Sequence, residues 1–220
     1  MTRVKIPLTF ASIRTAHAER SNEITAKLAE FSAIGEFGSD EDLWAEMVFC
    51  FFTGGCSARM GIRSLAAVRH LLMTGEQPEL ADALVGSHRY PNARSKYIVA
   101  SRSFLQEHCQ MRLRSKLQSF DQPLERRDWL VREKGIKGLG YKEASHFLRN
   151  IGYRGYAILD KHVLNSLFEL KIIDDPKPPN TRSKYLMVEE KLKQITLELG
   201  IDFDELDLVL WSMKTGVILK

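Results

Sequence analysis

Residues Lys134 to Asp160 read KGIKGLGYKEASHFLRNIGYRGYAILD, and this stretch brings several chemical features close together in the chain. A turn rich in glycine comes first, and a short amphipathic helix with Lys142 in its first turn follows it. The helix is expected to end at Gly152, after which a loop leads to Asp160 at the head of the next helix. The stretch therefore predicts a lysine and an aspartate that are both held at helix starts.

The glycine turn has two interpretations. Gly138 and Gly140 permit backbone conformations that other residues avoid, and they leave room for another backbone to approach. Successive backbone N–H groups in such a turn, ahead of a helix N-terminus, form an anion site suited to a DNA phosphate. The same residues also fit an ordinary turn between two packed helices.

The helix after the turn has an expected buried face of Ala144, Phe147, Leu148 and Ile151. The opposite side carries Lys142, Ser145, His146 and Arg149. A cation in the first turn of a helix meets the positive end of the helix dipole, and both this and desolvation favour the neutral amine. A neutral lysine amine can attack a sugar carbon and form a Schiff base. The alternative is a solvated surface lysine.

Asp160 precedes Lys161 and an apolar helical run, so it is first of all an N-cap residue. A carboxylate held by backbone N–H groups stays ionised. It can then stabilise positive charge on a sugar or help a nucleophile to lose its proton. The structural and the catalytic roles are compatible.

Composition sets broad limits on function. The chain has 220 residues, of which 44% are hydrophobic and 27% charged, as expected for a soluble protein of one or two domains. The net charge of +4 favours a polyanionic partner only weakly. Three cysteines and six histidines show no metal-ligand spacing, so neither a metal nor another cofactor is expected. No signal peptide or membrane span is indicated, which predicts a cytoplasmic protein.

Helical periodicity runs through nearly every longer segment, and no strand is convincingly indicated. We therefore expect an all-α fold of ten to twelve helices. The most apolar helix follows Ser39 and is expected at the centre of a helical domain spanning residues 39–151. Residues 1–38 and 152–220 would form a second helical domain. Lys142 and Asp160 would then come from opposite sides of a cleft between the two domains.

The segment 135–152, followed by AILDKHVL at 157–164, resembles the helix-hairpin-helix and aspartate signature of the DNA glycosylase superfamily. The sequence of this segment is most similar to that of the type 2, archaeal-type 8-oxoguanine DNA glycosylase/AP lyases. Residues 49–62, 88–99 and 211–220 are also similar to that family. The resemblance thus covers most of residues 40–220, and the hairpin with its spaced lysine and aspartate is the specific part.

The resemblance implies that Lys142 is the Schiff-base nucleophile and Asp160 the activating carboxylate. It also implies that Trp211 stacks on a flipped base and that Lys220 contacts the oxidised purine. The chain departs from the family at Thr53-Gly54-Gly55, where a Thr-Ala-Asn-like sequence is usual. The hairpin reads Ile-Lys-Gly-Leu-Gly instead of the superfamily's Leu-Pro-Gly-Val-Gly. The cysteine cluster of endonuclease III-like relatives is absent, which argues against that branch.

The C-terminal region adds its own signal. The last helix has an expected buried stripe of Leu206, Val209, Leu210 and Met213. Trp211 lies off this stripe, so its indole packs on either a flipped base or a neighbouring helix. The apolar residues before Lys220 would hold the terminal carboxylate at a defined point, where an acceptor facing N7 distinguishes 8-oxoguanine from guanine. The alternative is a packed or frayed terminus.

The sequence as a whole predicts a monomeric, bifunctional glycosylase/AP lyase acting on double-stranded DNA that contains 8-oxoguanine. In a prokaryote it would be associated with the nucleoid. The expected phosphate contacts are Lys137, Gly138, Gly140, Arg149, Arg89 and Arg94. Two alternatives remain: a glycosylase for another damaged base, and a non-catalytic helix-hairpin-helix DNA-binding module in which Lys142 contacts a phosphate.

Overall fold

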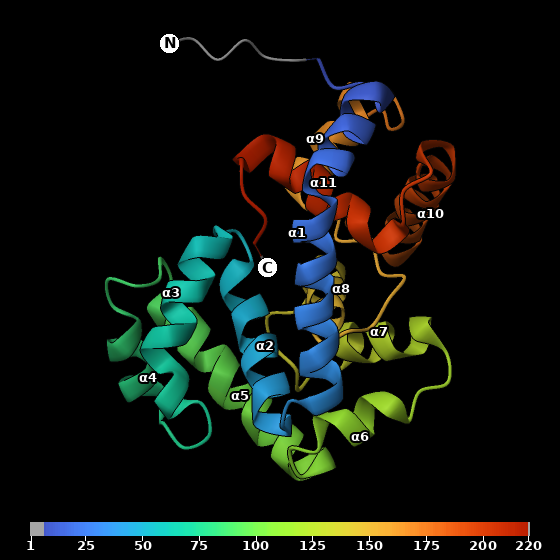
Figure 1. The fold of residues 1–220 in the computed structure, drawn as a ribbon. Coiled ribbons are helices and arrows are strands. Elements are labelled where there is room, and N and C mark those ends of the chain that lie inside the picture. Colours follow the sequence, from blue (N-terminus) through green and yellow to red (C-terminus); the bar gives the residue numbers. More distant parts are fainter. Residues whose placement is uncertain (1–6, 220) are drawn as a thin grey trace. The chain divides into compact units, whose positions relative to one another are not determined.

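The computed structural model describes residues 7–219, and within them it contains eleven α-helices, one 3-10 helix and no β-strand (Figure 1). The all-α prediction is confirmed. The helices are α1 (Phe10–Phe37), α2 (Asp40–Thr53), α3 (Ala58–Val68), η1 (Arg69–Leu71), α4 (Gln77–Leu84), α5 (Pro91–Cys109), α6 (Leu113–Gln118), α7 (Pro123–Arg132), α8 (Tyr141–Asn150), α9 (Lys161–Glu169), α10 (Arg182–Leu199) and α11 (Phe203–Thr215).

The chain divides into two compact units. The central unit comprises residues 31–154, and the terminal unit comprises residues 7–30 and 155–219 of the described chain. The helix α1 contributes to both units, because the boundary falls between Glu30 and Phe31. None of the helices in residues 7–219 combines the length and the apolar character that crossing a membrane requires.

The core of the central unit is built around α2, in which every residue from Leu43 to Thr53 is buried. Ser39 starts this helix: its hydroxyl accepts from the Asp42 N–H at 3.1 Å, and the Asp42 carboxylate accepts in return from the Ser39 N–H at 3.0 Å. The helices α3, α5, α6 and α8 all pack against α2. In Figure 1 these five helices are coloured from light blue (α2) through green to yellow (α8). The packing makes α2 the support for α8.

In the terminal unit, α9 and α10 pack against α11. The first part of α1 is fixed to this unit by polar contacts. His17 Nε2 lies 2.7 Å from Glu205 Oε2, and Arg14 Nε donates to the carbonyl of Leu199 at 3.1 Å. These contacts join helices from the two ends of the chain.

The buried stripe predicted for α11 is partly wrong. Leu206, Val209 and Leu210 are buried as expected, but Leu208 is buried too, and Met213 is only half-buried. Leu208 is buried because the core of the terminal unit covers more than one face of α11. In the last turn Ser212 is buried, whereas Met213 lies on a side that the core covers only in part.

Candidate functional site

The turn between α7 and α8 depends on Gly138. Its φ angle of 79° lies in the left-handed region, and a Cβ on this residue would come within 2.6 Å of Cδ2 of Tyr97. The next residue but one, Gly140, is the N-cap of α8 with φ −90° and ψ −176°, which any residue can adopt. Of the two glycines, only Gly138 therefore uses a backbone conformation that other residues avoid.

Lys137 lies in the same turn. Its backbone N–H donates to Oγ of Ser101 at 2.9 Å, while its side chain belongs to an exposed residue. The bond fixes the backbone of the turn against α5. The backbone of Lys137 is thus fixed, while its side chain is exposed to solvent.

The helix α8 is buried on more sides than its pattern predicted. All residues from Ala144 to Asn150 are buried, including Ser145, His146 and Arg149, which were expected on a polar face. Two partners explain this: α2 covers one side, where the rings of Phe49 and His146 lie 5.6 Å apart, and α7 covers another. The first three residues of α8 are less buried, and the side chain of Lys142 is 22% exposed.

The start of α8 is also tied to α7. The Tyr141 hydroxyl donates to Oδ1 of Asp128 at 2.9 Å. Burial and this bond raise the pKa of Tyr141, so the phenol stays protonated at neutral pH. Arg127 Nη1 donates to Oγ of Ser145 at 3.2 Å one turn further along. The first turn of α8, which carries Lys142, is therefore held in place by side chains of α7.

A buried polar group lies between α2 and α8. Asn150 Nδ2 donates to Oε2 of Glu46 at 3.1 Å, and both residues are 5% exposed or less. The pKa of the nearby Cys50 thiol is raised well above its ordinary value, first by burial and then by the charge of Glu46. A thiol of this kind stays protonated and is a poor nucleophile. Of Cys50 and Lys142, Lys142 is therefore the more accessible nucleophile.

Glu143 lies beside the predicted nucleophile, and the sequence interpretation did not single it out. Its Oε1 lies 3.7 Å from Nζ of Lys142, and its side chain is 18% exposed. A Cβ on Gly54, in the loop after α2, would lie 3.7 Å from the same oxygen. The signal available in the sequence was a carboxylate directly beside the lysine in the first turn of a helix.

Two of the predicted phosphate contacts are already used inside the central unit. Arg94 Nη2 donates to the Gly54 carbonyl, and its guanidinium lies 5.2 Å from the centre of the Tyr97 ring. Arg149 is 4% exposed, with its guanidinium 4.6 Å from the centre of the Phe31 ring. Both cations thus contribute to packing.

Arg89 is exposed and lies two residues before α5. Its guanidinium is 5.2 Å from the centre of the Tyr90 ring, which is itself 42% exposed. The backbone N–H of Tyr90 donates to Nδ1 of His88 at 2.9 Å, and His88 Nε2 lies 3.2 Å from the carbonyl oxygen of Phe52. The buried His88 therefore fixes the backbone that presents Arg89 and Tyr90.

Asp160 is the N-cap of α9, in the terminal unit. Its Oδ1 accepts from the N–H groups of His162 and Val163, both at 2.8 Å. These two bonds confirm the capping role and hold the carboxylate in a fixed direction. Lys142 belongs to the central unit, so the two predicted catalytic residues belong to different units.

The loop that leads to Asp160 is buried and held by side chains. Gly155 N–H donates to Asp204 Oδ1 at 2.7 Å, and Ala157 N–H donates to Glu189 Oε2 at 2.9 Å. The Tyr185 hydroxyl donates to the Ala157 carbonyl at 2.7 Å. A buried loop must satisfy its backbone groups, and here α10 and α11 supply the partners. The position of Asp160 is thus fixed by the loop that precedes it and by the helix α9 that follows it.

Trp211 lies on α11 and is half-buried. Its ring meets His162 edge to face, with ring centres 6.4 Å apart and planes at 88°. The indole therefore contacts the helix that Asp160 caps, two residues after that aspartate. Lys220, the other predicted base-recognition residue, lies outside the described residues.

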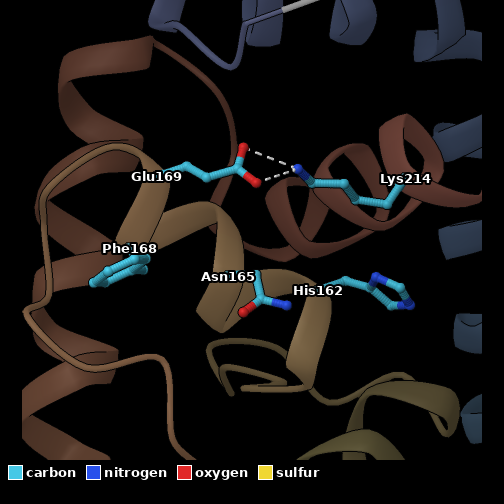
Figure 2. A pocket seen from close by; sticks show the side chains of 5 residues that line it. All are labelled: His162, Asn165, Phe168, Glu169 and Lys214. Atoms are coloured by element: carbon cyan, nitrogen blue, oxygen red, sulfur yellow. Dashed lines mark hydrogen bonds and ion pairs between the residues drawn. The ribbon is translucent and has the colours of Figure 1, made fainter. Parts of the chain in front are cut away.

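A pocket with a volume of about 420 Å³ lies in the terminal unit, beside α9 and α11 (Figure 2). It is lined by His162, Asn165, Phe168, Glu169 and Lys214. Lys214 Nζ is 3.0 Å from each carboxylate oxygen of Glu169, and this ion pair joins the two helices. None of the predicted site residues lines the pocket.

The described residues contain no group of three or more His, Cys, Asp or Glu side chains placed to hold a metal ion.

Comparison with known proteins gives a consistent result. The family model for 8-oxoguanine DNA glycosylase matches residues 24–201. The 8-oxoguanine DNA glycosylase/AP lyase of Korarchaeum cryptofilum is 42% identical over 183 residues, covering 83% of this chain and 84% of the relative. The enzyme of the same name from Methanocaldococcus jannaschii is 36% identical over 205 residues, covering 93% and 95%.

Solved structures agree. The crystal structure of the 8-oxoguanine DNA glycosylase of Thermotoga maritima matches with a TM-score of 0.87 and 34% identity, over 96% of this chain and 98% of the other. The Methanocaldococcus jannaschii enzyme in complex with a 15mer DNA containing 8-oxoguanine matches with a TM-score of 0.85 and 34% identity. That match covers 95% of this chain and 100% of the other.

Proposed function

Because this chain belongs to the 8-oxoguanine DNA glycosylase family, we propose that it is a bifunctional DNA glycosylase and AP lyase. Its substrate is double-stranded DNA containing 8-oxoguanine. The observation that carries the proposal is the placement of Lys142, an accessible amine in the first turn of a helix whose residues from Ala144 to Asn150 are all buried. The helix follows a turn in which Gly138 has φ 79° and a Cβ would come within 2.6 Å of Tyr97.

In the proposed reaction, the neutral amine of Lys142 attacks C1′ of the flipped nucleotide. The C1′–N9 bond breaks, and the base leaves with the bonding electrons and takes up a proton. The C1′–O4′ bond then opens, O4′ takes up a proton, and Nζ loses one proton. What remains is an iminium bond between C1′ and Lys142 Nζ, which carries one positive charge.

The lyase step follows from that iminium. Loss of a proton from C2′ supplies the electrons that break the C3′–O3′ bond, and the strand is cut 3′ to the lesion. We assign Asp160 the role of the fixed carboxylate that stabilises positive charge during base departure. Its two bonds from backbone N–H groups support this role, since they hold the carboxylate in a fixed direction.

DNA binding is proposed to rest on phosphate contacts near the turn. The backbone N–H groups at Gly138 and Gly140 precede the N-terminus of α8, and the side chains of Lys137 and Arg89 are exposed. Arg94 and Arg149 are assigned instead to holding the central unit together, because both guanidinium groups make the internal contacts described above.

Recognition of the lesion is assigned to Trp211, which would stack on the extruded base, and to Lys220. Extrusion costs roughly a few kcal/mol, and stacking on a half-exposed indole recovers part of that cost. The protein is proposed to act as a monomer on chromosomal DNA inside the cell, at the nucleoid in a prokaryote. The chemistry assigned to these side chains requires no cofactor.

Borohydride trapping tests the proposal, because only a Schiff base is reduced to a stable protein–DNA adduct. The wild-type protein should form the adduct with an 8-oxoguanine duplex, and Lys142→Gln should form none. Lys137→Gln is the matched control: it removes an exposed lysine five positions earlier and should weaken binding while still giving the adduct. Equal adduct with wild type and Lys142→Gln would show that another amine is the nucleophile.

A further inference from the structure

Glu143 follows the proposed nucleophile directly, and the charged ends of the two side chains lie close together. Glu143 Oε1 is 3.7 Å from Lys142 Nζ, and the side chains are 18% and 22% exposed. Adjacent residues on a helix do not normally face each other. The two side chains must therefore turn toward one another, in a site that shields them from most of the solvent.

The carboxylate of Glu143 also lies between two stretches of backbone. A Cβ on Gly140 would be 3.2 Å from its Oε2, and a Cβ on Gly54 would be 3.7 Å from its Oε1. The same Cβ on Gly54 would be 3.4 Å from Nη2 of Arg94, which binds the Gly54 carbonyl. Glu143 is thus confined between the turn before α8 and the loop after α2.

We propose that Glu143 is a positioning residue for the reaction: its carboxylate holds the Lys142 side chain beside Gly54 and stabilises the cationic Schiff base that Lys142 forms. This inference rests on the proposed function, because it requires Lys142 to be the nucleophile.

The charge that Glu143 would stabilise appears on a defined atom. On an abasic site, the neutral amine adds to the C1′ aldehyde carbon, and a proton moves from nitrogen to oxygen. The carbinol oxygen takes up one further proton and leaves as water, and C1′ and Nζ become joined by an iminium bond with one positive charge. That charge is centred on the atom that lies 3.7 Å from Glu143 Oε1 in the resting protein.

Other charged groups near Lys142 do not replace Glu143. Glu46 and Cys50 lie on α2, but the Glu46 carboxylate accepts from Asn150 and the Cys50 thiol is protonated. Arg149 and Arg94 carry positive charge, which disfavours a second cation nearby. On the other flank of α8, Arg127 and Asp128 of α7 bind Ser145 and Tyr141.

The inference predicts a specific defect in Glu143→Gln, which keeps the shape of the side chain and removes its charge. With a duplex that contains a pre-formed abasic site, the trapped fraction of bound protein should fall roughly three- to tenfold, the effect of one partly screened charge at about 4 Å. The Kd for the same duplex should stay within about twofold. Glu143→Asp keeps the charge on a shorter side chain and should trap more than Glu143→Gln.

Glu125→Gln is the matched control. Glu125 occupies the first turn of α7, so the variant loses the same favourable interaction with a helix N-terminus. It should trap as wild type does. Trapping by Glu143→Gln at the wild-type level would overturn the inference. So would a fall in DNA affinity and thermal stability large enough to explain the lost adduct, because that pattern indicates a purely structural role.

The two proposals fail in different ways. If wild type forms no adduct with either the 8-oxoguanine or the abasic duplex, the proposed function is wrong. If wild type, Glu125→Gln and Glu143→Gln all form the adduct in equal amounts, only the proposed role of Glu143 is wrong.

Discussion

The ring of Tyr97 lies directly against the backbone of Gly138, at a distance that leaves no room for a side chain. A Cβ on Gly138 would be 2.6 Å from Cδ2 of Tyr97, and the glycine has φ 79°. Tyr97 also lies beside the guanidinium of Arg94, which holds the loop after α2. One aromatic ring of α5 thus contacts both the turn before Lys142 and the arginine that binds Gly54.

Gly138→Ala should lower the free energy of unfolding by about 2–4 kcal/mol. The left-handed backbone costs roughly 1 kcal/mol or more for alanine, and displacement of the Tyr97 ring adds a packing cost of similar size. Gly86→Ala separates the two effects. Gly86 has φ 74° with nothing within 4 Å of a Cβ, so this variant should lose only about 1 kcal/mol. Urea unfolding measures both, and equal losses would contradict the role of Tyr97.

Asp160→Asn and Asp160→Ala should separate capping from charge. Asparagine caps helices about as well as aspartate, so the free energy of unfolding of Asp160→Asn should stay within about 0.5 kcal/mol of the wild-type value. That of Asp160→Ala should fall by about 1 kcal/mol. Excision of 8-oxoguanine in single turnovers should fall in both, by roughly a hundredfold or more, because both lack the carboxylate. If Asp160→Asn excises at the wild-type rate, Asp160 is only a helix cap.

His88 should make the stability of the protein depend on pH. Burial lowers the pKa of His88, the hydrogen bond to the Phe52 carbonyl opposes this in part, and the charge of Arg94 lowers the pKa as well. The unfolded chain therefore takes up this proton at a higher pH than the folded protein does. The stability contributed by neutral His88 is complete above its unfolded pKa of about 6.5 and is lost as the pH falls through the lower folded pKa.

Protonation at Nδ1 would also remove the acceptor for the Tyr90 N–H, which ties the titration of His88 to the backbone beside Arg89. The free energy of unfolding should thus fall as the pH is lowered from about 7.5 through about 6.5 towards the folded pKa, and less steeply in His88→Asn. His70→Asn, at an exposed histidine of η1, is the control and should keep the wild-type slope. Identical slopes in all three proteins would contradict the assignment.

Trp211→Ala should affect excision more than strand cleavage. Loss of stacking on the extruded base should slow excision of 8-oxoguanine by roughly five- to a hundredfold, while cleavage at a pre-formed abasic site should stay within about twofold. Trp129→Ala is the comparison, because Trp129 is also half-buried but packs on Phe120 in the central unit. Parallel losses of both activities in Trp211→Ala would indicate that the indole serves packing against His162.

Local chemistry made many elements of the fold predictable. Ser39 and Asp160 cap helices because a side-chain oxygen needs only the next few backbone N–H groups, all nearby in sequence. The environment of α8 was not predictable in this way. Ser145 and Arg149 fall on its polar face by helical spacing, and their burial depends on α2 and α7, which no periodicity within α8 can reveal.

The site shows the same division. The sequence placed Lys142 and Asp160 at helix starts, as the structure does, because those positions depend only on nearby residues of the chain. Glu143 and Gly54 lie far apart in sequence, and their proximity arises only when α2 and α8 pack. The need for glycine at 138 likewise depends on the ring of Tyr97 as well as on the turn.

The division of α1 between the two units has a consequence for synthesis on the ribosome. Residues 31–154 form one uninterrupted segment, so the central unit can fold as soon as this segment has emerged. Residues 10–30 of α1 must wait, because the helices they join in the terminal unit are translated after residue 155. A nascent chain halted before α9 would therefore expose the apolar side chains of Ile13 and Ile24, which are fully buried in the finished protein, and such an intermediate should be a preferred client of chaperones.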